Sequence, residues 1–267
     1  MRRIALAVAI SLLVTGSALA TETVVSTHAV LGEFARVIGG DAIDVVTIIP
    51  SGFCPAHYDL APSDLAAVMN ASLVLYSGFE PWMETLLDAT ESEGAVLQLP
   101  GSWSTPTAAV GKVEAIRDAL ADRFPESAGT FAANAEAYIE DLRSLERSLL
   151  EQAEAAEVSS TAVICIEWQL DFVSWLGFEV AATYGIPEGL SLRDLVQLAD
   201  VGRSADVMLI IDNLQSGVGF GAKLAQEIGA LHIVLSNFPG AMPGTATVLD
   251  LFTANAEALL TAIEPIE

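Results

Sequence analysis

Basic residues are scarce in this sequence. The 267 residues include 11 Lys and Arg against 35 Asp and Glu, which gives a formal net charge of −24 at pH 7. A surface of this sign repels phosphate backbones, so we expect no nucleic-acid partner, and it also disfavours anionic membranes and anionic ligands. A cationic ligand or a metal ion fits this electrostatic field better.

Cysteine and histidine are also rare. Cys54 and Cys165 are the two cysteines, too few to form the disulfide framework of a chain this long. They could pair, ligate a metal or lie buried as thiols, and the sequence leaves these possibilities open. There are three histidines, so any histidine at a predicted binding site stands out.

Long hydrophobic runs are absent except at the start of the chain. Arg2 and Arg3 precede an apolar stretch, Ile4 to Val14, and Ala18-Leu19-Ala20 is a typical cleavage signal before Thr21. Residues 1–20 therefore read as a secretory signal peptide, too short for a membrane span. We expect an exported, periplasmic or extracytoplasmic protein without membrane insertion after cleavage.

Short apolar stretches alternate with helical patterns along the rest of the chain, and this alternation is typical of parallel sheets covered by helices. The sequence predicts an α/β fold with two lobes of parallel sheet. The expected strands lie at 24–25, 45–49, 73–76 and 96–99 in the first half, and at 162–167, 178–182, 207–211 and 233–235 in the second.

The segment between the two halves has the most regular pattern. Its apolar residues recur at spacings of 4, 3, 4, 3 and 4, a sustained heptad seam. No proline interrupts the run from Pro125 to Val158, so one rigid helix of about 45 Å could join the lobes; a core helix or a coiled-coil dimer are the alternatives. We expect a monomer with a lobe at 21–124, a helix at 125–158 and a lobe at 159–267. The seam residues are Phe131, Ala135, Tyr138, Leu142, Leu145 and Leu149.

Polar side chains that can bind metals follow the predicted strands in both halves. Because ligands of parallel α/β folds bind at the carboxyl ends of strands, these side chains are candidate binding residues. The candidates are His28, His57, Glu167, Gln169, Asp212 and Asn237. His232 precedes a predicted strand and is interpreted as structural, and Glu80 as a helix-start residue.

Three stretches of the first half resemble one known family. Residues 52–65 read GFCPAHYDLAPSDL, close to the pattern G-x-D-P-H-x-Y/F-x-P-x-P-x-D, and residues 25–41 and 71–82 also fit. These patterns are typical of the zinc- and manganese-binding substrate-binding proteins of ABC importers. The resemblance implies two lobes on a helical backbone, one divalent metal ion as cargo, a membrane permease as partner and no enzymatic activity.

The resemblance also implies roles for the candidate residues. His57 falls on the first histidine ligand of the family, Glu167 or Gln169 near the third ligand, Asp212 on an acidic position and Asn237 near the usual aspartate. A second histidine is normally part of a P-H-x-W-x-x-P loop, but residues 101–107 read GSWSTPT. His28 is a candidate replacement; the alternative is a histidine hydrogen-bonded at the end of its strand.

Two other functions remain open from the sequence. A related binding protein with a degenerate metal site could carry a metal chelate or another small ligand. A secreted metal-dependent hydrolase could use His57, Asp59 and Glu167. The sequence contains no G-x-S-x-G, H-E-x-x-H or P-loop motif, so other chemistries have little support.

Overall fold

The computed structural model describes residues 22–90 and 94–264. The predicted signal peptide, residues 1–20, lies outside these ranges. Within them, no helix combines the length and the apolar character needed to cross a membrane.

The N-terminal lobe is built on a parallel sheet with the strand order β2-β1-β3-β4. Strand β1 lies inside the sheet, and its Val24 and Val25 are fully buried, as expected of a strand that is covered on both faces. The strands are β1 (Glu22–Ser26), β2 (Ile43–Thr47), β3 (Leu73–Tyr76) and β4 (Ala95–Gln98), and the flanking helices are α1 (Ala29–Gly39), α2 (Pro62–Met69) and α3 (Met83–Thr90).

The C-terminal lobe repeats this plan with the strand order β6-β5-β7-β8, again all parallel. The predicted two-lobed α/β architecture is therefore confirmed. The strands are β5 (Ala162–Ile166), β6 (Glu179–Tyr184), β7 (Leu209–Asn213) and β8 (Leu231–Leu235), and the helices are α6 (Leu170–Leu176), α7 (Leu192–Ser204), α8 (Gly219–Ile228) and α9 (Val248–Ile263).

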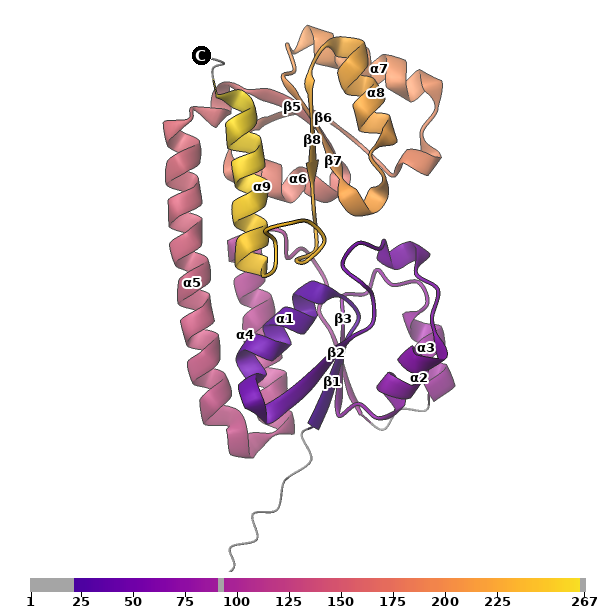
Figure 1. Cartoon of the computed structure of the whole chain (residues 1–267), viewed down its shortest axis with the longest axis vertical. Coiled ribbons are helices and arrows are strands. Elements are labelled where there is room, and N and C mark those ends of the chain that lie inside the picture. Colours follow the sequence, from indigo (N-terminus) through magenta and orange to yellow (C-terminus); the bar gives the residue numbers. More distant parts are fainter. Residues whose placement is uncertain (1–21, 91–93, 265–267) are drawn as a thin grey trace, which may run out of the picture.

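A long helix, α5 (Ala128–Ala155), runs beside both lobes (Figure 1). Its 28 residues span about 42 Å at 1.5 Å per residue. The predicted helix over 125–158 is shorter at both ends, because Pro125–Ser127 form a 3-10 turn and Glu157, with a φ of +52°, leaves the helical conformation after Ala155. A second helix, α4 (Pro106–Arg123), packs along α5 and was not predicted. The domain boundaries at residues 124 and 158 stay predictions.

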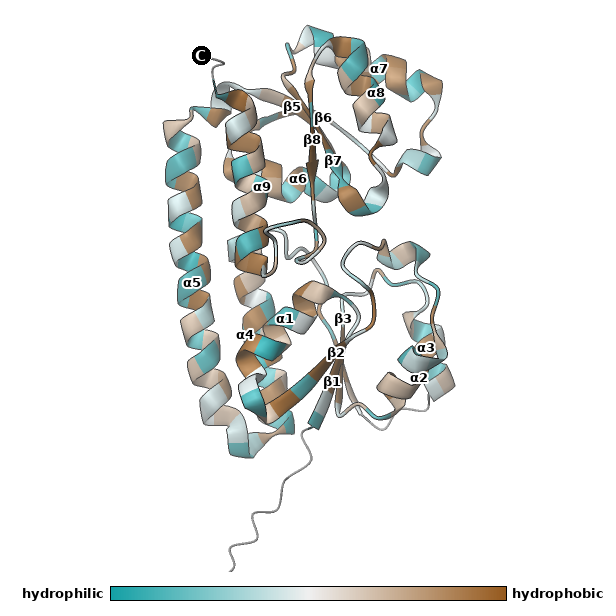
Figure 2. Cartoon of the chain, in the orientation of Figure 1, coloured by the Kyte–Doolittle hydropathy of each residue, from teal (hydrophilic) through white to brown (hydrophobic). Residues whose placement is uncertain are grey.

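The heptad seam of α5 is an intramolecular contact. Phe131, Ala135, Leu142 and Leu149 are buried in a core that also contains residues of α1, α4 and α9. Figure 2 shows the resulting alternation of hydrophobic and hydrophilic bands along α5, and the apolar strands between the helices. The coiled-coil dimer is therefore not needed to bury this seam.

The carboxyl ends of the strands in both sheets face the boundary between the lobes (Figure 1). Short 3-10 turns follow several of them: η2 (Pro55–His57) after β2, η5 (Glu167–Gln169) after β5 and η7 (Leu214–Ser216) after β7. The fold thus places most of the candidate residues along this interlobe boundary.

Candidate functional site

His28 lies at the centre of the interlobe boundary. It follows β1 and precedes the first turn of α1, and only 1% of its surface is exposed. Its Nε2 lies 2.7 Å from the hydroxyl oxygen of Ser77, which follows β3. Burial, and to a lesser degree the nearby Lys112 ammonium, lowers the pKa of His28 to about 3. The imidazole is therefore neutral at any physiological pH.

Aromatic rings from both lobes surround His28. Its ring centroid lies 4.7 Å from that of Trp103, 5.3 Å from that of Phe238 and 5.8 Å from that of Phe79. Trp103 belongs to the loop before α4, whereas Phe238 belongs to the loop between β8 and α9. The sequence also allowed a histidine at the end of its strand that is hydrogen-bonded to the backbone. His28 does lie at the end of its strand, but its hydrogen-bond partner is the side chain of Ser77 and not the backbone.

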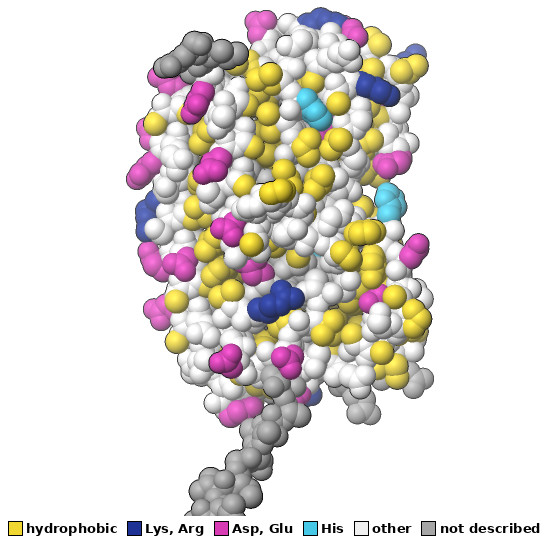
Figure 3. Space-filling model, in the orientation of Figure 1, with side chains coloured by type: hydrophobic (Ala, Val, Ile, Leu, Met, Phe, Trp, Pro, Cys, Tyr) yellow, Lys and Arg dark blue, Asp and Glu magenta, His cyan; other side chains and the backbone are white. Residues whose placement is uncertain are grey.

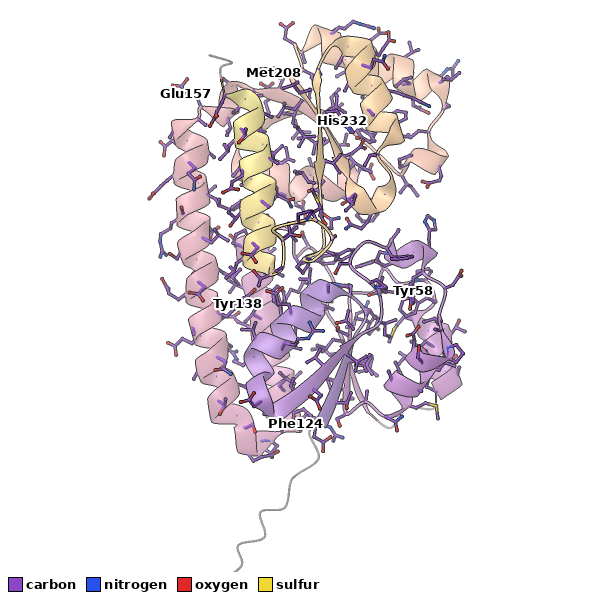
Figure 4. All side chains as sticks on the ribbon, viewed as in Figure 1. Tyr58, Phe124, Tyr138, Glu157, Met208 and His232 are labelled. Atoms are coloured by element: carbon purple, nitrogen blue, oxygen red, sulfur yellow. The ribbon has the colours of Figure 1, made fainter. Side chains whose placement is uncertain are left out.

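His57 lies in η2 and is exposed. The turn is fixed on both sides: the indole of Trp82 donates to the carbonyl oxygen of Pro55 at 2.9 Å, and the Tyr58 hydroxyl donates to Asp64 at 3.0 Å. These two bonds hold the turn that carries the imidazole in the N-terminal lobe; Tyr58, the next residue, is labelled in Figure 4.

Glu167 and Gln169 occupy the same turn, η5, but have opposite environments. Glu167 is exposed, whereas Gln169 is buried and donates to Asn237 at 2.8 Å and to Asn213 at 3.3 Å. The carboxylate of Glu167 is therefore accessible to solvent. Gln169 belongs to an uncharged network of amide side chains.

This amide network extends across the lobe boundary. The side-chain nitrogen of Gln215 donates to the carbonyl oxygen of Ser51, in the loop that leads to His57, at 3.0 Å, and to the Ser236 hydroxyl at 2.9 Å. The backbone N–H of Asn237 donates to the Gln215 side-chain oxygen at 3.2 Å. Gln215 follows β7 and is not among the predicted candidate ligands, whereas Asp212 lies within that strand.

Asp212 is fully buried and is held within the C-terminal lobe. The hydroxyl of Tyr184 donates to its Oδ1 at 2.5 Å, and Nε2 of His232 lies 2.7 Å from its Oδ2 (His232 is labelled in Figure 4). A Cβ at Gly221 would collide with the carboxylate, which explains one glycine of the Gly-rich start of α8. His232 lies within β8 and not before that strand as predicted, and Asp212 is its partner.

Glu80 lies at the turn before α3, where its carbonyl oxygen accepts from the N–H of Met83, the first residue of that helix, at 3.2 Å, but its side chain does not cap the helix. Its carboxylate accepts hydrogen bonds from the Thr27 hydroxyl at 2.5 Å, from the Ser77 N–H at 3.1 Å and from the Gly78 N–H at 2.7 Å. Glu80 ties the end of β1 to the end of β3 and thereby orients the Ser77–His28 pair.

The loop that lacks the family histidine has a backbone that favours glycine. Residues 100–106 read PGSWSTP, so Gly101 stands where P-H-x-W-x-x-P has histidine, and its φ is +86°. The ammonium of Lys112 donates to the carbonyl oxygens of Leu99 and Pro100 under this loop. A cation is thus buried close to the position of the missing ligand.

Both cysteines are free thiols. Cys165 is buried in β5, where burial raises the pKa of its thiol to about 12, so it is protonated at neutral pH. Cys54 is partly exposed and precedes η2. Across residues 22–90 and 94–264, no three His, Cys, Asp or Glu side chains lie close enough together to hold a metal ion.

Comparison with known proteins identifies the family. Residues 24–262 match the sequence family described as "Zinc-uptake complex component A periplasmic". The chain belongs to this family. "Manganese-binding lipoprotein MntA" of Halalkalibacterium halodurans is 30% identical over 207 residues, which are 71% of this chain and 68% of that protein. "Zinc-binding lipoprotein AdcA" of Streptococcus pneumoniae is 28% identical over 169 residues, which cover only 34% of its length.

Solved structures share the fold of this family member. A Mn-bound periplasmic metal binding protein from Candidatus Liberibacter asiaticus superposes with a TM-score of 0.81 at 19% identity, over 91% of this chain and 100% of that one. A crystal structure of ZnuA gives a TM-score of 0.78 at 20% identity, over 92% and 100% of the two chains. These matches support the two-lobed architecture described above.

Proposed function

We propose that this protein is the extracytoplasmic substrate-binding protein of an ABC importer and that its cargo is a divalent transition metal, zinc or manganese. The match of residues 24–262 to the zinc-uptake family carries this proposal. It is supported by relatives named as manganese- and zinc-binding lipoproteins. The net charge of −24 also favours attraction of a cation.

The protein transports and does not catalyse. It is exported by a cleaved signal peptide over residues 1–20, acts as a monomer and delivers its cargo to a membrane permease. The family match and the metal-binding relatives support this reading over the alternative of a hydrolase that uses His57, Asp59 and Glu167.

The accessible donors suggest where the cargo first binds. His57 at the rim of the N-terminal lobe and Glu167 at the rim of the C-terminal lobe are both exposed. An imidazole and a carboxylate are suitable ligands for zinc and manganese. His28, Gln169 and Asn237 lie deeper, and they reach the metal only after the lobes rearrange. Asp212 is the weakest candidate, since both of its oxygens have partners.

Metal analysis of the exported protein tests the proposed function. Protein purified without chelators or added metals should contain close to one equivalent of zinc or manganese by elemental analysis. After chelation, calorimetric titration with each metal should show saturable binding. Protein that carries no metal and binds neither ion would overturn the proposal in favour of a chelate or another small ligand.

Replacement of His57 tests the first ligand. His57→Ala should weaken metal affinity at least about tenfold, which corresponds to about 1.4 kcal/mol, because an imidazole donor is lost. The fold should persist, since the side chain is exposed. Glu154→Gln, an exposed change on α5, is the matched control and should leave the titration unchanged. Equal affinities of His57→Ala and wild type would remove His57 from the site.

A further inference from the structure

The two ring nitrogens of His28 have different environments. Nε2 is paired with the Ser77 hydroxyl, but Nδ1 is buried and has no hydrogen-bond partner. In the part of the chain that the structure describes, it is the one buried side-chain nitrogen or oxygen of this kind. A buried polar atom without a hydrogen-bond partner destabilises the folded protein, so it needs an explanation. A ligand that binds this nitrogen when the lobes are apart is one explanation.

The ring is covered by aromatic side chains of both lobes. We call Trp103 and Phe238 the aromatic cover. Their rings are nearly parallel, with an interplanar angle of 19° and centroids 6.1 Å apart, and both lie within 5.3 Å of the His28 centroid. Phe79, from the N-terminal lobe, lies 5.8 Å away. Because Trp103 and Phe238 belong to different lobes, a ligand that passes between them to reach His28 crosses the lobe boundary.

The cover leaves no room for an ion. Phe238 is 3% exposed. His28 itself is 1% exposed, and it does not line the small recess that Trp103 shares with Gln169 and Asn237. A ligand can reach His28 only if the cover moves.

Few polar contacts hold the cover closed. The indole N–H of Trp103 donates to the carbonyl oxygen of Asn237 at 3.4 Å, a long bond, and Gln215 donates to the carbonyl oxygen of Ser51 at 3.0 Å. A modest separation of the lobes breaks both bonds and draws Phe238 away from Trp103. The cover is therefore built to part along the lobe boundary.

We propose that Trp103 and Phe238 form a gate over Nδ1 of His28 and that this nitrogen binds the cargo metal once the lobes separate. The proposal rests on the proposed function and deepens it. The proposal requires the tautomer in which the protonated Nε2 donates to the Ser77 hydroxyl oxygen and Nδ1 keeps its lone pair, an arrangement common among metal-binding histidines.

The gate can be tested without any metal. Diethyl pyrocarbonate acylates accessible imidazole nitrogens, and peptide mass spectrometry reads each histidine separately. In wild type, His57 should react quickly and His28 slowly. Trp103→Ala should accelerate the reaction of His28 at least tenfold and leave His57 within twofold. An unchanged rate at His28 would overturn the gate.

Two variants separate the gate from a general loss of structure. Trp168→Ala removes a tryptophan that is 52% exposed and should not change the rate at His28. Trp103→Phe keeps a ring in the cover and should give a rate between those of wild type and Trp103→Ala. Acceleration at His28 and His232 together, with a lowered melting temperature, would indicate unfolding and would also overturn the gate.

Zinc tests the ligand role of Nδ1 separately. In the Trp103→Ala variant, zinc should protect His28 from the reagent. Glu154→Gln, added to this variant as a control, should leave that protection unchanged. Zinc that binds in calorimetry without protecting His28 would overturn His28 as a ligand. If zinc and manganese fail to bind at all, the proposed function and the ligand role fail, but fast acylation in Trp103→Ala still identifies the gate.

Discussion

Buried carboxylates and buried amides have different tasks in this protein. The oxygens of Glu80 and Asp212 accept short hydrogen bonds inside their own lobes. Gln169 and Asn237 are joined in an uncharged network near the lobe boundary. The amide network at the boundary is therefore uncharged, and the Glu167 carboxylate, which a cation can reach, is exposed.

The neutral His28 makes stability depend on pH. Its pKa falls from 6.5 to about 3 on folding, so the unfolded chain binds a proton that the folded chain rejects. The contribution is fully present above pH 6.5 and is lost as the pH falls toward the folded value. Between pH 6.5 and about pH 5 the unfolding free energy should drop by about 2 kcal/mol more in wild type than in His28→Gln.

Denaturant unfolding of both proteins across this pH range measures the difference. The range lies above the usual pKa of carboxyl groups, so their titration contributes little. Parallel stability profiles for wild type and His28→Gln would contradict the prediction. They would mean that the His28 ring becomes protonated in the folded protein.

Asp212 provides a test of structure against binding. Asp212→Ala should remove about 2–4 kcal/mol of stability, because the Tyr184 hydroxyl and the His232 ring lose a buried acceptor. Where the variant is folded, its zinc affinity should match that of wild type. Circular dichroism and calorimetry at low temperature measure the two quantities. Weakened zinc binding with unchanged stability would instead make Asp212 a ligand.

At the scale of the elements, helices α4 and α5 together connect the lobes. The heptad spacing of α5 predicted its buried face, and Phe131, Ala135 and Leu142 are indeed buried. Helix α4 also carried a signal: Thr105 accepts from the Ala108 N–H as N-cap and Pro106 is the first helical residue.

The seam of α5 predicts unequal effects of matched substitutions. Leu142→Ala should cost about 2–5 kcal/mol of unfolding free energy, because it leaves a cavity in the core. Leu150→Ala, at a position that is 37% exposed on the same helix, should cost less than about 1 kcal/mol. Thermal and denaturant unfolding measure both, and equal losses would contradict the assignment of the seam to the core.

The sequence was sufficient for the fold but only partly for the site. All expected strands exist, and β3 has the predicted bounds, because apolar runs between turn residues determine buried parallel strands. Side-chain direction is not encoded in this pattern. Asp212 and Asn237 both lie at the ends of strands, yet Asp212 turns toward Tyr184, whereas Asn237 meets Gln169. The placement of Glu80 and Gln215 likewise depended on contacts distant in sequence.

At the scale of the whole molecule, a few bonds tie the two lobes together. Glu33 of α1 accepts from the Val248 N–H, at the start of α9, at 2.8 Å and from the Tyr138 hydroxyl of α5 at 3.0 Å. The Gln215–Ser51 bond lies at the other side of the boundary. Relative movement is thus restrained by the long helices on one side and by isolated hydrogen bonds on the other.

The charge of the whole molecule predicts salt-sensitive capture. Acidic side chains are spread over the visible surface and basic ones are few (Figure 3). The field of a chain with a net charge of −24 should attract a divalent cation at long range. The zinc association rate, from stopped flow with a zinc dye, should fall several-fold as salt rises from about 10 mM to about 150 mM. A salt-independent rate would show that local contacts alone control capture.

The position of Trp103 gives the protein an optical property of its own. Indole emission shifts to longer wavelength and is quenched differently when a packed ring becomes hydrated, and Trp103 is one of 4 tryptophans in the chain. It is the one that stacks on a ring of the opposite lobe, on Phe238. Lobe separation should therefore shift the wavelength of the intrinsic fluorescence, so this emission reports cargo loading in unlabelled protein.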